Sequence, residues 1–250
     1  MKFIINIISY SIFFYILILF YQFINEKKEN VYCYAVKIKI EQNEDNNFIS
    51  EKDIWEILNN KNDTIFNKKI QEIDISKIEK KIKEHNFIEN AEVYKTINGK
   101  LNIEIKERTP ILRIIDENNN SIYVDKKGII MSLSKKYTAR VLFANGKINL
   151  KNKNLSKDKS FLNLYKIASY IYNKDFWNAQ IQQIYINEKE EFELVPKVGS
   201  HIILFGKAKN IDKKFENLKI FYKNLQKNFY WNKYKTINLK FENQIVCLKK

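Results

Sequence analysis

Cysteine, histidine, glycine and proline are all scarce in this chain of 250 residues, which has 2 Cys, 2 His, 5 Gly and 2 Pro. Two cysteines cannot build a disulfide scaffold or supply the four thiolates of a structural zinc site. The low glycine and proline content excludes collagen-like and linker-like chains. A hydrophobic content of 45% excludes a disordered polar tail. Cys33 and Cys247 belong to different regions, and we expect two small packed side chains rather than a disulfide.

Residues that could carry catalysis are equally scarce. His85 and His201 lie far apart in the sequence, and we expect His85 near a helix end and His201 exposed at the start of a strand. The chain has no nucleophile elbow, phosphate-binding loop or metalloprotease motif. Glu104 and Glu107 lie three residues apart on a predicted strand, hence on opposite faces. We therefore predict no enzyme activity, no cofactor, no metal and no small-molecule substrate.

Acidic residues are fewer than basic ones, with 44 Lys and Arg against 29 Asp and Glu and a net charge of +15. Such a balance is typical of proteins that bind anions. However, 41 of the cations are Lys, and Lys, Ile and Asn together make up 114 residues. AT-rich codons supply these three amino acids, and a nucleic-acid binder would use more Arg. We therefore predict no nucleic-acid partner, and the sequence leaves open whether the charge is functional.

Charged residues are absent from one long stretch near the N-terminus, the 22 residues 3–24. As a helix it would measure about 33 Å, enough to cross a bilayer. A cleaved signal peptide would have a shorter apolar core and small residues at the cleavage site, which are missing here. The stretch therefore predicts an uncleaved membrane anchor after a tail of residues 1–2. Lys2 on one side against Lys27 and Lys28 on the other does not decide its orientation.

After the anchor, residues 31–107 have the pattern of a β-α-α-β-β unit. Ser50, with Asp53 three residues later, can cap the first helix. Asn98-Gly99 predicts a two-residue hairpin turn, because both residues tolerate positive φ. We expect strands near 31–40, 89–97 and 101–105, and helices that begin after Ser50 and after Asp74 or Ser76.

From residue 108 to residue 250 the pattern changes to short strands with two longer helices, which predicts a mixed α/β domain with a largely antiparallel sheet. Asp125 and Gly128 belong to a predicted hairpin turn. We expect strands at 112–115, 122–124, 129–131, 141–143, 181–186, 192–195, 202–205, 237–241 and 245–248, and helices at 161–172 and 211–225.

Several motifs in this order resemble those of the FtsQ/DivIB cell-division family. The segment Asp74–Ile78 resembles the entry to the second helix of the family's POTRA (polypeptide-transport-associated) domain, and Phe87–Val93 its next strand. Leu101–Pro110 resembles the "L-x-I-x-V-x-E-R-x-P" that ends that domain, and is the most specific of these motifs. Tyr123–Gly128 and Thr236–Phe241 resemble a hairpin and the final strand of the family's β domain. The resemblance covers nearly the whole chain, although the family's usual long cytoplasmic tail is missing.

The resemblance implies an α+β protein with a transmembrane helix, a POTRA-like domain at 31–107 and an FtsQ-type β domain at 108–250. It implies a single-pass protein of the inner membrane, with its N-terminus in the cytoplasm and its bulk in the periplasm. Its function would be that of a division scaffold. It would dock an FtsB-like and an FtsL-like protein and connect early division proteins to the septal peptidoglycan synthase complex.

The site residues that the resemblance implies fall into three groups. The partner-binding group is a terminal strand at the sheet edge, to which a partner strand could add. Within it, Phe241 would be the apolar anchor and Lys240 the cation that faces a partner carboxylate. The junction of the two domains and the hairpin of the β domain supply the other two groups. The residues are Ile237, Asn238, Leu239, Lys240, Phe241 and Asn243 at the edge, Glu107, Arg108 and Pro110 at the junction, and Asp125 and Gly128 in the hairpin.

Two other classes of protein remain open on the sequence alone. One is another POTRA-bearing envelope protein, of outer-membrane assembly or secretion. Its C-terminal half should consist of alternating strands of about ten residues, and the helical patterns at 161–172 and 211–225 count against it. The other is a membrane-tethered envelope enzyme, for which the chain lacks a credible nucleophile, base or metal set.

Overall fold

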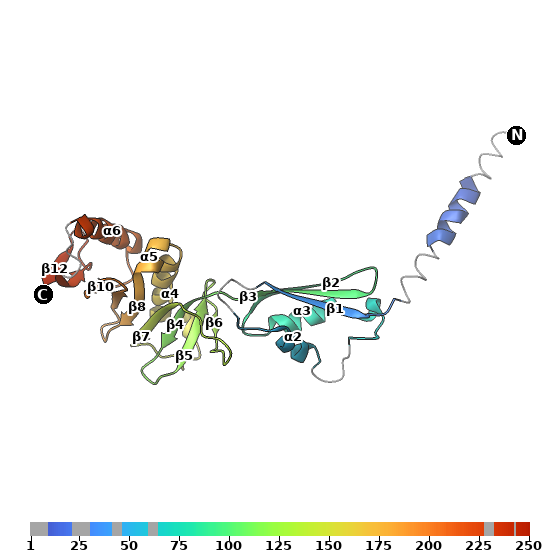
Figure 1. Cartoon of the computed structure of the whole chain (residues 1–250), viewed down its shortest axis with the longest axis horizontal. Helices are drawn as coiled ribbons and strands as arrows, with labels where there is room; N and C mark the ends of the chain where they lie inside the picture. The colour runs from blue at the N-terminus through green and yellow to red at the C-terminus, as the bar shows by residue number, and fades with distance from the viewer. Residues whose placement is uncertain (1–9, 22–30, 42–46, 60–64, 228–232, 243) are drawn as a thin grey trace. The chain divides into compact units, whose positions relative to one another are not determined.

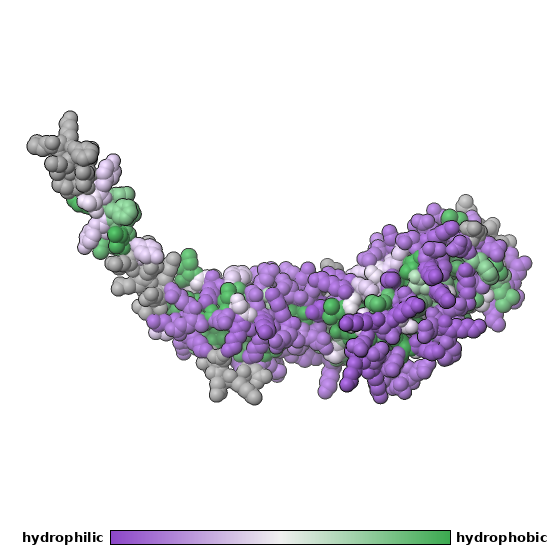
Figure 2. All heavy atoms as spheres, turned by 180° about the vertical axis from the view of Figure 1, so that it is seen from behind, coloured by the Kyte–Doolittle hydropathy of each residue, from purple (hydrophilic) through white to green (hydrophobic). Residues whose placement is uncertain are grey.

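The computed structural model describes residues 10–21, 31–41, 47–59, 65–227, 233–242 and 244–250. For residues 225–227 it describes the backbone only. The chain divides into two compact units, Met1–Glu107 and Arg108–Lys250. Residues 10–21 are helical and their side chains are exposed and mostly apolar (Figure 2). Of the predicted anchor 3–24, the residues on either side of 10–21 lie outside the described part. Among the described residues, none of the helices is both long enough and apolar enough to cross a bilayer.

After the helical residues 10–21, the described part of unit 1 contains a three-stranded sheet with two helices and a short 3-10 turn (Figure 1). Its central strand β3 pairs in parallel with β1 and antiparallel with β2. This confirms the predicted β-α-α-β-β order. The elements are β1 (Ala35–Glu41), α2 (Glu51–Leu58), the 3-10 turn (Ile70–Glu72), α3 (Ile75–Lys83), β2 (Ile88–Lys95) and β3 (Lys100–Glu107).

Local signals in the sequence explain where the elements of unit 1 begin and end. Ser50 and Asp53 form a reciprocal capping box at the start of α2, and Asp74 accepts a hydrogen bond from the Lys77 amide at the start of α3. Asn98 and Gly99 lie in the turn between β2 and β3, as predicted, and of these two residues Gly99 has the positive φ (85°). Alternate residues of β3 are buried against the helices, as the period of a half-buried strand requires.

Unit 2 is built on a nine-stranded sheet in the order β12-β11-β10-β9-β8-β7-β4-β5-β6. Five of its strand pairings are antiparallel and three are parallel, which confirms a mixed, largely antiparallel sheet. The strands are β4 (Pro110–Ile115), β5 (Ser121–Asp125), β6 (Ile130–Met131), β7 (Leu142–Gly146), β8 (Ile181–Ile186), β9 (Phe192–Pro196), β10 (Ile202–Gly206), β11 (Tyr234–Asn238) and β12 (Val246–Lys249). The helices are the 3-10 turn (Leu155–Lys157), α4 (Lys159–Tyr172), α5 (Asp175–Gln180) and α6 (Ile211–Lys227).

The core of unit 2 follows one register row across the sheet. Six neighbouring strands each contribute one fully buried residue to this row, and each of these residues is paired directly with the next. Together with the apolar faces of α4 and α6 they form a single hydrophobic cluster. The row ends at the half-buried Cys247 on β12. Cys33 and Cys247 are both free, the first buried and the second half-buried. The six buried residues are Ile114, Ala144, Ile184, Leu194, Ile203 and Ile237.

One histidine departs from the sequence-based expectation. His201 was expected to be exposed, but it is 2% exposed and its Nε2 lies 2.8 Å from the hydroxyl of Tyr222 on α6. Burial of the phenol raises the pKa of Tyr222 above its usual range. The sequence around His201 gives no sign of this, because the partner lies 21 residues further along the chain.

Candidate partner-binding edge

Two of the predicted site groups meet at the start of unit 2. Arg108 Nη1 donates to Asp125 Oδ2 over 2.9 Å, while Asp125 Oδ1 accepts from the amides of Lys127 and Ile129, each at 2.8 Å. Asp125 is 1% exposed, so its charge is compensated by a cation and two N–H groups. The hairpin and the junction residue therefore act together to fix the turn between β5 and β6.

Gly128 and Pro110 complete this arrangement. Gly128 has a φ of 80°, and a Cβ there would lie 3.2 Å from the ring of Tyr165, whose hydroxyl donates to the carbonyl of Lys126. Pro110 is buried and pairs with Asp125 in the β4–β5 register. These contacts are internal to unit 2, so we assign this group a structural role.

Glu107, which the motif places beside Arg108, serves unit 1 instead. Its carboxylate is 1% exposed, and Oε1 accepts from the amide of Ile49 over 2.8 Å, just before the Ser50 cap of α2. Burial raises the pKa of Glu107 to about 7, against the opposing effect of hydrogen bonds from Ile49 and Phe48. It thus connects the end of β3 to the start of α2.

The prediction that residues 237–243 form the edge strand of the sheet is wrong. β11 ends at Asn238, and it lies between β10 and β12. Of the predicted edge residues, Ile237 is fully buried and Asn238 is paired on both sides. Within the described residues the two outer strands of the sheet are β6 and β12 (Val246–Lys249), and β12 pairs there with β11 only. Sequence reasoning predicted this strand but missed its position at the edge.

The side chains of β12 alternate between the core face and the opposite face. Cys247 faces the core row, whereas Val246 and Leu248 are 44% and 57% exposed. Leu248 pairs with Thr236, which in turn pairs with Ile202, itself 40% exposed. At this edge of the sheet, exposed apolar side chains therefore lie on a strand that has a neighbouring strand on one side only among the described residues.

The other predicted edge residues form a bent segment after β11. Leu239 is buried, and its amide donates to the carbonyl of Leu204 over 3.0 Å. Lys240 forms an ion pair with Glu191 of the β8–β9 connection, so its carboxylate partner is internal to the chain. Phe241 is 48% exposed and does not share the burial of Leu239, because the strand has already ended. Asn243 lies outside the described residues.

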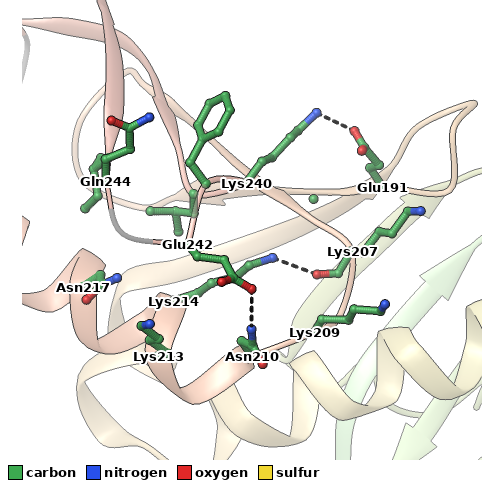
Figure 3. Close-up of a pocket in the computed structure, with 14 residues that line it drawn as sticks. Glu191, Lys207, Lys209, Asn210, Lys213, Lys214, Asn217, Lys240, Glu242 and Gln244 are labelled. Carbon is green, nitrogen blue, oxygen red and sulfur yellow. Dashed lines mark hydrogen bonds and ion pairs between the residues drawn. The ribbon is translucent and has the colours of Figure 1, made fainter.

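Beside this segment lies a pocket of about 250 Å³ with many lysines (Figure 3). It is bounded by the start of α6, the loop after β10 and the segment that leads into β12. Glu242 accepts from Asn210 over 3.4 Å, and Lys214 donates to the carbonyls of Phe205 and Lys207. Five lysines line the pocket, namely Lys207, Lys209, Lys213, Lys214 and Lys240.

Two pKa shifts describe the electrostatics of this pocket. Burial lowers the pKa of Lys214, opposed by the charge of Glu191. The hydrogen bond from Lys240 lowers the pKa of Glu191, helped by the positive charges of Lys189 and Lys207. These cations therefore favour the ionised form of Glu191.

The family model for the FtsQ/DivIB C-terminal related domain matches residues 109–248, more than half of the chain. This chain belongs to the FtsQ/DivIB family. A second model, for a POTRA-like domain, matches residues 31–106. No curated protein matches the chain significantly. The sequence-based resemblance to an FtsQ/DivIB protein is thereby confirmed.

Membership in the FtsQ/DivIB family indicates a membrane-associated cell-division protein that interacts with other proteins of the division machinery. Neither of the matched families is an enzyme family. Among the described residues, no group of three or more His, Cys, Asp or Glu side chains could hold a metal ion. Because membership in the FtsQ/DivIB family suggests interaction with other division proteins, the surfaces of this protein are the candidate sites.

Proposed function

We propose that this FtsQ/DivIB protein is a non-enzymatic divisome scaffold that docks an FtsB-like and an FtsL-like protein at the edge strand β12. Through them it would connect early division proteins to the septal peptidoglycan synthase complex. One observation carries the proposal: among the described residues β12 is one of the two outer strands of the sheet, and Val246 and Leu248 are exposed on it.

An edge strand offers N–H and C=O groups without partners in the sheet, and a partner strand can satisfy them. Backbone pairing supplies affinity, and side chains supply register and specificity. Val246, Leu248 and the nearby Phe241 would be the apolar contacts, and burying a side chain of this size contributes about 1.5–3 kcal/mol. Phe241 thus keeps the role predicted for it, beside a different strand.

We further propose that residues 3–24 anchor the protein in the inner membrane, with residues 1–2 in the cytoplasm and the two units in the periplasm. The proposal is supported by the 22 uncharged residues and by the helical conformation of 10–21. Residues 31–107 would form the POTRA domain and 108–250 the β domain. Reporter fusions at both ends test the orientation, and a reporter active only in the cytoplasm at the C-terminus would contradict it.

The docking edge is tested with the double variant Val246→Lys and Leu248→Lys of the full chain. We expect at least tenfold weaker capture of the co-expressed FtsB-like and FtsL-like pair, because two charged side chains replace the apolar contacts. The control is Ile220→Lys, a single substitution of the same kind at an exposed position of α6 (60% exposed). Equal capture by all three proteins would reject β12 as the docking edge.

The cellular role is tested by depletion. Loss of the protein should give filamentous cells without constrictions, and normal division after depletion would reject the division role. The runner-up, a POTRA-bearing protein of outer-membrane assembly or secretion, is disfavoured by the match of residues 109–248 to the FtsQ/DivIB family. If the runner-up were right, depletion would cause an envelope-assembly defect in cells that still divide, rather than filaments.

A further inference from the structure

A second pocket in unit 2 has walls made of aromatic rings. It has a volume of about 350 Å³ and lies where α4, α5 and α6 meet (Figure 1). Helix α4 supplies Tyr170, α5 supplies Phe176 and Trp177, and α6 supplies Phe215. Its lining residues all differ from those of the pocket with five lysines. Its volume is in the range of sites for small ligands.

The four rings of this aromatic pocket form one connected wall. Tyr170 stacks on Phe215, with 4.7 Å between the ring centroids and 12° between the planes. The centroid of Trp177 lies 4.9 Å from that of Phe215 and 4.8 Å from that of Phe176. Trp177 and Phe215 are buried, whereas Phe176 is 43% exposed and Tyr170 is half-buried. Two buried rings therefore hold two accessible rings in place, which provides a rigid apolar surface for a ligand.

Charged side chains of both signs form the rim of the aromatic pocket. Lys174 and Asp175 lie at the start of α5, Glu216 and Lys219 lie on α6, and all four are exposed. Lys219 Nζ lies 5.8 Å from the ring centroid of Phe176. Among the described residues, neither Asp175 nor Glu216 has an ion-pair partner. The rim therefore offers hydrogen-bond donors and acceptors with no net charge.

This neutral rim is an exception in unit 2. Unit 2 (residues 108–250) has 28 Lys and Arg against 12 Asp and Glu, a net charge of +16, while unit 1 (residues 1–107) has 16 against 17, a net charge of −1. A cationic ligand would meet Lys174 and Lys219 at the rim, and an anionic ligand would meet Asp175 and Glu216. The aromatic pocket therefore has little electrostatic preference for an ion of either sign.

Aromatic walls and a rim of donors and acceptors together fit a sugar. A sugar ring has an apolar C–H face, which packs on an aromatic ring, and hydroxyl groups that both donate and accept hydrogen bonds. A purely apolar ligand would instead remove water from the charged side chains without giving them partners. An acetamido group adds one N–H donor, one C=O acceptor and a methyl group. The lining therefore favours a neutral N-acetylated amino sugar over an ion or a hydrocarbon.

We propose that the aromatic pocket binds an N-acetylated amino sugar of a peptidoglycan glycan strand. The sugar ring would pack on Phe176, and its hydroxyl and acetamido groups would bond to Asp175, Glu216 and the rim lysines. The choice of polymer rests on the proposed function, which places unit 2 in the periplasm beside septal peptidoglycan. Unit 2 would thus contact the glycan directly, while β12 docks the protein partners.

The first test titrates chitotetraose, a soluble oligomer of N-acetylglucosamine, into the full-length protein in a detergent without a sugar headgroup. Saturation-transfer NMR of the sugar is the readout. An open site for a sugar of this size should have a Kd of about 1 mM. Tetralysine and tetraglutamate at the same concentration should not displace the sugar. Displacement by either peptide, or no saturation by about 10 mM chitotetraose, would overturn the inference.

Two pocket variants and one control locate the site. Phe176→Ala removes an accessible ring and should weaken sugar binding about tenfold. Asp175→Asn with Glu216→Gln keeps the size of two exposed rim residues and removes their charge, and should weaken it about three- to tenfold, because charged acceptors form stronger hydrogen bonds. The control Tyr185→Ala removes an exposed ring of β8 outside the pocket and should bind like the wild type. Equal binding by the wild type and both pocket variants would overturn the inference.

Isolated peptidoglycan identifies the polymer. After an amidase has removed the stem peptides, the wild-type protein should co-sediment with the glycan and Phe176→Ala should not. About 0.3 M salt screens the attraction of the +16 charge of unit 2 for anionic groups. Equal co-sedimentation of the two proteins would overturn the assignment.

Capture of the FtsB-like and FtsL-like pair reports on the proposed function separately, because the residues of β12 are not among those that line the aromatic pocket. A wild-type protein that captures the pair but does not bind chitotetraose would reject this inference alone. One that binds the sugar but does not capture the pair would reject the docking proposal and support the sugar site.

Discussion

The buried carboxylate of Glu107 should make unit 1 less stable as the pH rises through neutrality. Burial raises the pKa of Glu107 to about 7, from 4.5 for an exposed glutamate. Between these two values the folded protein keeps a proton that the unfolded chain has released. The free energy of unfolding therefore falls as the pH increases from 4.5 to 7 and is constant beyond. The shift corresponds to about 3 kcal/mol over the whole range.

The Glu107→Gln substitution removes this dependence while it keeps the contact. A glutamine oxygen can still accept from the Ile49 amide, at 2.8 Å in the wild type, and its amide does not ionise in this range. We expect the variant to be more stable than the wild type at pH 8 and to lose this advantage at pH 5. The free energy of unfolding of the variant minus that of the wild type should therefore increase by about 3 kcal/mol between pH 5 and pH 8.

Hydrogen exchange of the peptide that covers β3 is the suitable assay, because it reports on unit 1 separately in a chain of two units. The control is Glu104→Gln on the same strand, which removes a partly exposed carboxylate that accepts from the Tyr94 hydroxyl. It should retain the pH dependence of the wild type. The reasoning would be refuted if wild type and Glu107→Gln differed in the stability of unit 1 by the same amount at pH 5 and at pH 8.

Three further substitutions test other parts of unit 2. Asp125→Ala should lower the free energy of unfolding by about 3–5 kcal/mol in thermal melts, because Arg108 and two amides lose their buried acceptor; a loss below about 1 kcal/mol would contradict this. Gly146→Ala should prevent normal folding at 37 °C, judged by soluble yield, because its Cβ would lie 2.1 Å from the Ile186 carbonyl oxygen at a φ of 105°. Phe241→Ala should weaken partner capture three- to tenfold without a change in thermal stability, since its ring is 48% exposed; unchanged capture would remove it from the docking surface.

The local part of the fold could be predicted from the sequence. Caps such as Ser50 and Asp74 and the alternation of apolar residues are determined by neighbours within a few positions, and the structure has them where they were predicted. Helix α5 was missed because six residues are too few to establish a helical period. The end of β11 was placed three residues too late, because alternation continues past Asn238 while the pairing with β10 and β12 ends.

The candidate site was harder to predict because it depends on long-range pairing. Which strand lies at the edge is a property of the whole sheet, and nothing in residues 246–249 distinguishes an outer strand from an inner one. The ion pair between Lys240 and Glu191 joins residues 49 positions apart, and Glu107 meets Ile49 across 58. The motif around Arg108 and Asp125 showed that these residues matter, but only the structure shows that they contact each other.

The uneven division of charge also bears on how the two units tolerate their surroundings. With a net charge of +16, unit 2 repels itself, and its compact state is weakened when few counter-ions are present. Unit 1, almost neutral, has no such cost. Ionic strength therefore acts selectively, because added salt screens the repulsion within unit 2 and has little to screen within unit 1. Added salt should thus raise the free energy of unfolding of unit 2 while that of unit 1 stays almost unchanged.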